Sequence, residues 1–195
     1  MRLRIALVLS FVCTIPVFAC SIPSPCYSQE SSAEKPAEVK PFLFEGTKVA
    51  VTPPASWKSV PPKNQMVEGE FRFPAEGKES IRITFSRSGG SIDANVKRWI
   101  GQFEGAKPDQ TKVDKKTVDK LTVHTVDVAG TYLDSMGGGP FAPGPTKKQE
   151  NYRMIGAIVE MPKGQNLFIK AYGPKDLVEK TKADFDKMIE GITNK

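Results

Sequence analysis

TYLDSMGGGPFAPGPTKKQENYRMIGAIV, residues 131–159, is the stretch that decides between a nucleotide-binding fold and an antiparallel sheet. Three consecutive glycines meet three prolines in its middle. The segments on either side, HTVDVAGTY and NYRMIGAIVEM, have the alternating and β-branched residues that are typical of strands. Glycine and proline suit an exposed loop that does not join a sheet. The stretch therefore predicts a hairpin with GGGPFAPGP at its tip.

Two phosphate-binding motifs resemble this tip without matching it. Gly139 and Gly144 have the spacing of a Walker loop, but Pro145 follows where the motif needs lysine. Gly137, Gly139 and Ala142 match a dinucleotide fingerprint, which must open a helix to hold the pyrophosphate. Prolines remove the backbone N–H groups that would donate to a phosphate. Both motifs are therefore interpreted as accidental.

Two segments earlier in the chain have the period of two that is typical of half-buried strands. MVEGEFRFP, residues 66–74, is followed after a loop by SIRITFSRS, residues 80–88. The predicted inward residues are Val67, Gly69, Phe71, Phe73, Ile81, Ile83 and Phe85, and the predicted outward ones include Glu68, Glu70, Arg72, Arg82 and Thr84. These segments predict an antiparallel pair with one solvent-facing side.

Two other segments have helical spacing. SIDANVKRWIGQFEG predicts a helix that Ser91 or Asp93 caps and Gly105 ends, with Trp99 and Phe103 on its core face. The segment from Pro174 to Ile192 predicts a second helix with an apolar stripe. Hairpins separated by two helices, without repeated βα alternation, favour an α+β fold with a mostly antiparallel sheet.

The first 28 residues predict a signal peptide. Arg2 and Arg4 precede a 15-residue apolar segment, which is short for a membrane-spanning helix. Two cleavage sites compete, because VFAC resembles a lipobox in which Cys20 would be lipidated, whereas CYSQ suits ordinary cleavage after Ser28. We favour the soluble form, while an uncleaved anchor is the remaining alternative.

Residues 29–41 are then expected to form a flexible leader, and residues 42–195 a single domain. The three cysteines all lie within the first 26 residues, so the predicted domain has no disulfide and no thiol nucleophile. Removal of Arg2 and Arg4 lowers the number of Lys and Arg residues from 28 to 26, against 22 Asp and Glu, which leaves a net charge of +4. No basic run resembles a nucleic-acid-binding tail.

The sequence contains no local pattern of residues that is typical of a catalytic or metal-binding site. His124 is the single histidine, and no second histidine accompanies it to build a zinc site. Carboxylates such as Glu68, Glu70, Asp127 and Asp134 are scattered over predicted outward positions. We therefore expect no catalytic, cofactor-binding or metal-binding residues. The predicted loop instead offers a contact surface made of Met136, Phe141, Lys147 and Lys148.

The order of these elements resembles the PsbP-like superfamily. The resemblance rests on PASW, on Trp99 followed by Gln102–Phe103, and on VDVAGTY, FIKAYGP and FDKMIEGI, over residues 42–193. It implies an α/β/α sandwich around an antiparallel sheet and a binding or accessory role. No functional residue is carried over from it.

Together these observations predict an exported, non-enzymatic binding or accessory protein of the periplasm or cell envelope. Its partner would be a protein or small ligand, with membrane contact only through a lipid at Cys20. A small-ligand or lipid carrier is the first alternative, and it requires an apolar cavity. A carboxylate-dependent hydrolase is the second, and it requires two acids that face each other in a pocket.

Overall fold

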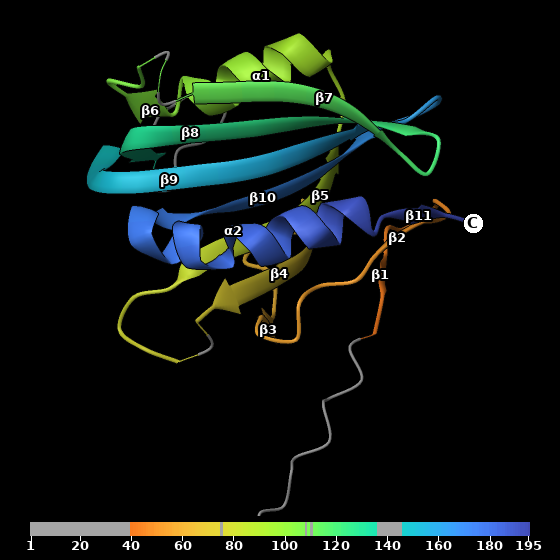
Figure 1. The fold of residues 1–195 in the computed structure, drawn as a ribbon, viewed down its shortest axis with the longest axis horizontal. Coiled ribbons are helices and arrows are strands. Elements are labelled where there is room, and N and C mark those ends of the chain that lie inside the picture. The colour runs from red at the N-terminus through yellow and green to blue at the C-terminus, as the bar shows by residue number, and fades with distance from the viewer. Residues whose placement is uncertain (1–39, 75, 108, 110, 136–145) are drawn as a thin grey trace, which may run out of the picture. The chain divides into compact units, whose positions relative to one another are not determined.

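The computed structural model describes residues 40–74, 76–107, 109, 111–135 and 146–195, and its centre is an eight-stranded antiparallel sheet (Figure 1). The strands are, in spatial order, β3 (Lys58–Val60), β4 (Val67–Phe73), β5 (Ile81–Ser88), β10 (Asn166–Pro174), β9 (Thr146–Glu160), β8 (Leu121–Ser135) and β6 (Phe103–Glu104), with β7 (Thr111–Val118) also paired to β8. The α+β prediction is confirmed.

Both strands of the hairpin that was predicted around the glycine- and proline-rich stretch are present. β8 and β9 pair antiparallel from Thr122 with Glu160 to Ser135 with Thr146. Residues 136–145 lie outside the described residues. Because the chain after them continues as strand β9, the helix that a dinucleotide fingerprint requires does not follow.

Helices α1 (Ile92–Ile100) and α2 (Lys175–Glu190) cover opposite faces of the sheet. Alternation along β9 sends Ile155 and Ala157 toward α2, and Met154 and Ile158 toward α1. Figure 1 shows α2 running alongside β9 and β10. Both faces of the sheet therefore contribute to a packed core, as in an α/β/α sandwich.

The two cores differ in size. The α2-side core is the larger and includes Phe44, Val49, Trp57, Phe71, Ile81, Ile83, Phe85, Val123, Leu167, Ile169, Val178, Phe185 and Ile189. The α1-side core consists of Val96, Trp99, Phe103, Val126, Val128, Tyr132, Met154, Ile158 and Phe168. Burial of each large apolar side chain contributes about 1.5–3 kcal/mol.

The first helix ends earlier than the spacing predicts. Ser91 caps it as expected, since its Oγ accepts a hydrogen bond from the Ala94 N–H at 3.2 Å. Gly101, not Gly105, is the C-cap. Phe103 lies in β6 opposite Tyr132 and still joins Trp99 in the α1-side core. The apolar spacing of α1 continues into β6 because both elements direct side chains into the same core.

The assignments of Glu70 and Thr84 to a solvent-facing side are wrong, because both residues are buried. The Glu70 side chain has no exposed area and accepts hydrogen bonds from Arg72 and Arg82. The alternation itself is correct, because Phe71 faces the α2-side core. The error lies in expecting solvent on the second face, which here is also built over by side chains.

A small sheet closes one end of the domain. It consists of β1 (Phe42–Leu43), β2 (Val49–Val51) and β11 (Thr193–Asn194), in that order. Near it, Trp57 of the PASW segment donates a buried hydrogen bond of 2.8 Å to Thr181 Oγ1 on α2. Within the described ranges, neither helix is long and apolar enough to cross a membrane.

Candidate functional site

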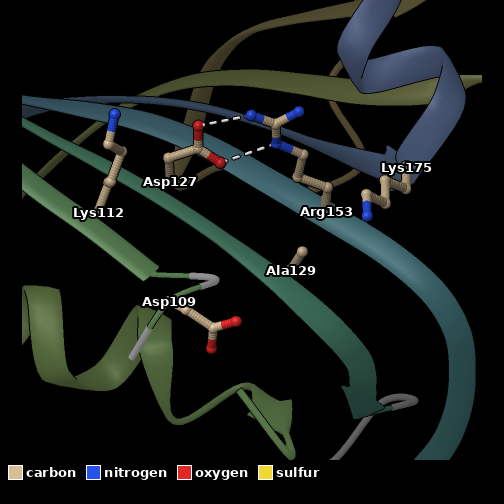
Figure 2. A pocket seen from close by; sticks show the side chains of 6 residues that line it. All are labelled: Asp109, Lys112, Asp127, Ala129, Arg153 and Lys175. Carbon is tan, nitrogen blue, oxygen red and sulfur yellow. Dashed lines mark hydrogen bonds and ion pairs between the residues drawn. The ribbon is translucent and has the colours of Figure 1, made fainter. Parts of the chain in front are cut away.

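A polar cavity of about 240 Å³ lies where the start of α2 approaches the sheet (Figure 2). Asp127 of β8 and Arg153 of β9 form its floor, because odd-numbered residues of both strands face α2. Lys112 of β7 and Lys175 of α2 lie on either side of this pair in Figure 2. The site therefore combines residues from three strands and a helix.

The floor of the cavity is a bidentate ion pair. Arg153 Nε donates to Asp127 Oδ1 at 2.8 Å, and Nη2 donates to Oδ2 at 2.7 Å. Arg153 Nη1 also contacts Glu179 on α2. The hydrogen bonds to Asp127 raise the pKa of Arg153 above its usual range. Both oxygens of Asp127 are engaged, so this carboxylate is a positioned acceptor and not a free base.

A second cavity, of about 210 Å³, adjoins the first, since Lys112, Asp127 and Arg153 line both. We term the two together the α2–β7 groove. Its charged lining is Lys112, Arg153, Lys175, Lys182, Asp109, Asp114, Asp127 and Asp186. Four basic and four acidic side chains give a groove without a net charge, which suits a polar partner that carries both signs.

Comparison with solved structures identifies the fold. The solution structure of cyanobacterial PsbP from Synechocystis sp. PCC 6803 superposes with a TM-score of 0.52 at 12% identity, over 84% of this chain and 96% of that one. The chain has a PsbP-like fold.

Two further structures are similar at a lower level. The crystal structure of LpqN, involved in cell envelope biogenesis of Mycobacterium tuberculosis, has a TM-score of 0.49 and 14% identity over 79% of this chain and 88% of that one. The crystal structure of PA94 from Pseudomonas aeruginosa, a protein of unknown function, has a TM-score of 0.46 and 11% identity over 80% of this chain and 97% of that one. No family model and no curated protein matches the chain.

Only part of the predicted contact loop lies among the described residues. Cys20, Met136 and Phe141 lie outside the described residues. Lys147 and Lys148 are exposed near the start of β9, and Lys148 Nζ lies 2.6 Å from Glu104 Oε2 of β6. The contact role of the loop stays a prediction.

His124 occupies an ordinary strand position in this fold. Its Nε2 lies 3.2 Å from Glu160 Oε2 across the β8–β9 pair. Within the described part of the chain, no group of three or more His, Cys, Asp or Glu side chains is placed to hold a metal ion.

Sequence reasoning missed the Arg153–Asp127 pair, although the signal for it was present. The hairpin prediction places both residues on adjacent strands, and their alternation relative to Val126 and Met154 places them on one face. What was missing was the register, which depends on the length of the loop that joins the strands.

The opposite face of the PsbP-like sheet contains a lysine among aromatic rings. Lys170 of β10 is partly buried, and its Nζ donates to Gln102 Oε1 at 2.6 Å. The same nitrogen lies 4.8 Å from the ring centre of Tyr172, 5.6 Å from Tyr132 and 5.9 Å from Trp99. Burial, followed by the charges of Arg98 and Arg82, lowers the pKa of Lys170 to about 7, against a smaller opposing effect of Asp134.

We expect Lys170→Met to stabilise the protein most at low pH. The pKa of Lys170 lies below its unfolded value near 10.5, so the unfolded chain binds more protons between pH 7 and 10.5, and stability rises with pH across that window. Removal of the amine should raise the free energy of unfolding by about 1–3 kcal/mol at pH 6, and by less at pH 10. Urea unfolding at both pH values measures this difference.

Lys163→Met is the matched control, because Lys163 is exposed in the turn between β9 and β10. It should change stability equally little at both pH values. A Lys170→Met variant that is less stable than the parent at pH 6 would show that the rings and Gln102 hold the ammonium favourably.

Proposed function

We propose that this chain is an exported, non-catalytic binding or accessory protein of the cell envelope, and that its partner docks in the α2–β7 groove. The observation that carries the proposal is the composition of the groove, in which strands β7, β8 and β9 and helix α2 position basic and acidic side chains. Sites on regular elements keep a defined geometry. A partner with complementary charges would be recognised by that arrangement.

The internal pairing of the groove favours binding over acid–base catalysis. A hydrolase that uses two carboxyl groups needs one of them as a free acid or base. Asp127 and Asp109 line the same cavity, but Arg153 occupies both oxygens of Asp127. The pair therefore supports a role for Asp127 in positioning Arg153.

A carrier of small apolar ligands is the second candidate. A hollow of about 430 Å³ lies beside β1 and β3, and its apolar lining includes Phe42, Pro53, Pro54, Trp57 and Phe71. Mass spectrometry of extracts from gently purified protein tests this function. A recovered lipid that a Phe42→Gln variant fails to retain would support the carrier function over the accessory one.

Export is proposed from the N-terminal residues. We expect the mature protein to begin at Gln29, after cleavage behind Ser28. Intact-mass measurement of the protein from its own cells measures this directly. A mass that begins at Cys20 with added acyl chains would instead establish the lipoprotein form, and an intact Met1 would contradict both.

The groove itself is tested by site-specific cross-linking. A photoreactive residue at position 175, in the full chain and in its own cells, should capture a partner of defined mass. The same residue at position 163, which does not line the groove, should not capture it. Lys112→Glu should abolish the cross-link from position 175. Equal capture from both positions, or capture unaffected by Lys112→Glu, would contradict docking in this groove.

A further inference from the structure

A third polar cavity, of about 160 Å³, lies on the face of the sheet opposite the α2–β7 groove. Five adjacent strands, β4, β5, β10, β9 and β8, contribute to its lining, and β8 and β9 each supply two side chains, Tyr132 with Asp134 and Gln149 with Tyr152. We term it the arginine–tyrosine pocket, after its lining residues Arg72, Arg82, Tyr172, Tyr152 and Tyr132. The strand register holds Arg72, Arg82 and Tyr172 directly opposite one another.

Glu70 holds the two arginine side chains in place through hydrogen bonds. Its carboxylate accepts Arg82 Nε at 2.9 Å, Arg82 Nη2 at 2.7 Å and Arg72 Nη2 at 2.9 Å. The backbone N–H of Lys63 is a fourth donor, at 3.2 Å. The buried carboxylate is thus fully engaged, while both guanidinium groups are oriented before any ligand arrives.

The arginines retain donors that these bonds do not use. A guanidinium has five N–H donors. Among the described residues, Arg72 donates one hydrogen bond, and Arg82 donates two to Glu70 and one, of 3.1 Å, to the Tyr172 hydroxyl. The side chains of Arg72 and Arg82 are 24% and 20% exposed, so the remaining donors reach the cavity.

Other groups in the pocket also donate. The Tyr172 oxygen accepts from Arg82, which leaves its own proton for a ligand. Burial raises the pKa of Tyr132 and Tyr152, and a hydrogen bond to Tyr172 raises that of Tyr132 further, so both hydroxyls stay protonated at physiological pH and the Tyr152 hydroxyl can donate to a ligand. Lys63 adds a third basic residue to the lining, and Asp134 is the acidic residue among the described residues that line the cavity.

We propose that the arginine–tyrosine pocket binds a small molecule through a phosphate group. Arginine recognises phosphate in a bidentate manner, and phosphate oxygens accept from more donors than a carboxylate can. Three basic residues and three tyrosines line this cavity of about 160 Å³. The site lies apart from the α2–β7 groove, so this inference does not depend on the proposed function.

The test uses inorganic phosphate and the full chain in isothermal titration calorimetry, with sodium chloride at equal ionic strength as reference. Phosphate should bind, whereas chloride should not. Arg72→Gln and Lys63→Gln should each weaken binding about tenfold, the loss of one charged hydrogen bond. Tyr152→Phe keeps the ring stacked on Tyr132 and removes only the hydroxyl, so it should weaken binding about fivefold. Lys163→Gln, in the distant β9–β10 turn, should have no effect.

Two further arms distinguish the source of the phosphate. Glycerol 3-phosphate that competes with inorganic phosphate would indicate a soluble ester. Sedimentation with phosphatidylglycerol vesicles that Lys63→Gln and Tyr152→Phe abolish would indicate a lipid headgroup. Either result supports a phosphate site. Absence of binding in all arms, or equal loss with Lys163→Gln, would overturn the proposal, and Lys63→Gln and Tyr152→Phe keep it testable if Arg72→Gln does not fold.

Discussion

Replacement of Glu70 by glutamine is expected to lower the free energy of unfolding by about 3–5 kcal/mol. The Glu70 carboxylate is buried and receives three hydrogen bonds from Arg72 and Arg82. Glutamine keeps the shape but removes the negative charge and turns a donor toward Arg82, so two guanidinium groups lose their counter-charge. Urea unfolding at pH 7 measures the change.

The pH dependence of the same variant gives a second readout. Burial alone would raise the pKa of Glu70, but the hydrogen bonds from Arg82 and Lys63 and the charges of both arginines lower it below 4.5. A carboxyl group with a lowered folded pKa stabilises above its unfolded pKa, and that stability is lost as pH falls through the folded value. The parent should therefore lose stability below about pH 4.5, and Glu70→Gln should lack this part of the acid response.

Glu76→Gln is the control, because Glu76 is exposed in the loop between β4 and β5. It should alter stability by less than about 0.5 kcal/mol. A Glu70→Gln protein as stable as Glu76→Gln would show that the buried carboxylate is dispensable to the fold.

Gly156→Ala is expected to destabilise the protein by about 1–3 kcal/mol, because the α1-side core has no room for one methyl group. A Cβ at Gly156 of β9 would lie 2.5 Å from Trp99 Cζ3. Trp99 is 3% exposed and packs edge-on against Phe168, so a shift of its ring would disturb other core side chains. Thermal unfolding followed by near-ultraviolet circular dichroism reports both stability and the packing of Trp99.

Gly89→Ala separates this clash from a general effect of removing glycine. No heavy atom lies within 4 Å of a Cβ at Gly89, and its backbone avoids the left-handed region. It should leave stability nearly unchanged. A Gly156→Ala/Trp99→Leu double variant should lose less than the sum of the single losses, since the smaller side chain relieves the contact. Additive losses of stability would show that Gly156→Ala does not destabilise the protein through contact with Trp99.

The sequence predicted local structure well wherever one residue period covered a whole element. Phe71 and Ile83 fall on the buried face that alternation predicts, and Phe185 and Ile189 fall on the core side of α2. The prediction failed at Gly101, where the helix ends but the apolar spacing continues into β6. Periodicity records which side chains face a core and does not record where the backbone changes conformation.

Polar sites were less predictable than apolar faces. Glu70 looks like a solvent-facing strand residue, because its neighbours alternate with apolar ones. Its burial depends on Arg82, twelve residues away in the next strand, and on Lys63. Asp127 and Arg153 likewise meet across a hairpin, 26 positions apart. Such pairs arise from strand register and from what covers each face, and neither leaves a local pattern.

The sequence by itself determined the order and type of both helices and of the main strands, the antiparallel hairpin around the glycine- and proline-rich stretch, and the apolar stripes of both helices. Those properties follow from interactions between residues a few positions apart. The tertiary structure alone decided that both faces of the sheet are covered, that Glu70 holds two arginines, and that Asp127 meets Arg153. Burial of a charged side chain is set by the groups that surround it in space, which only the assembled sheet brings together.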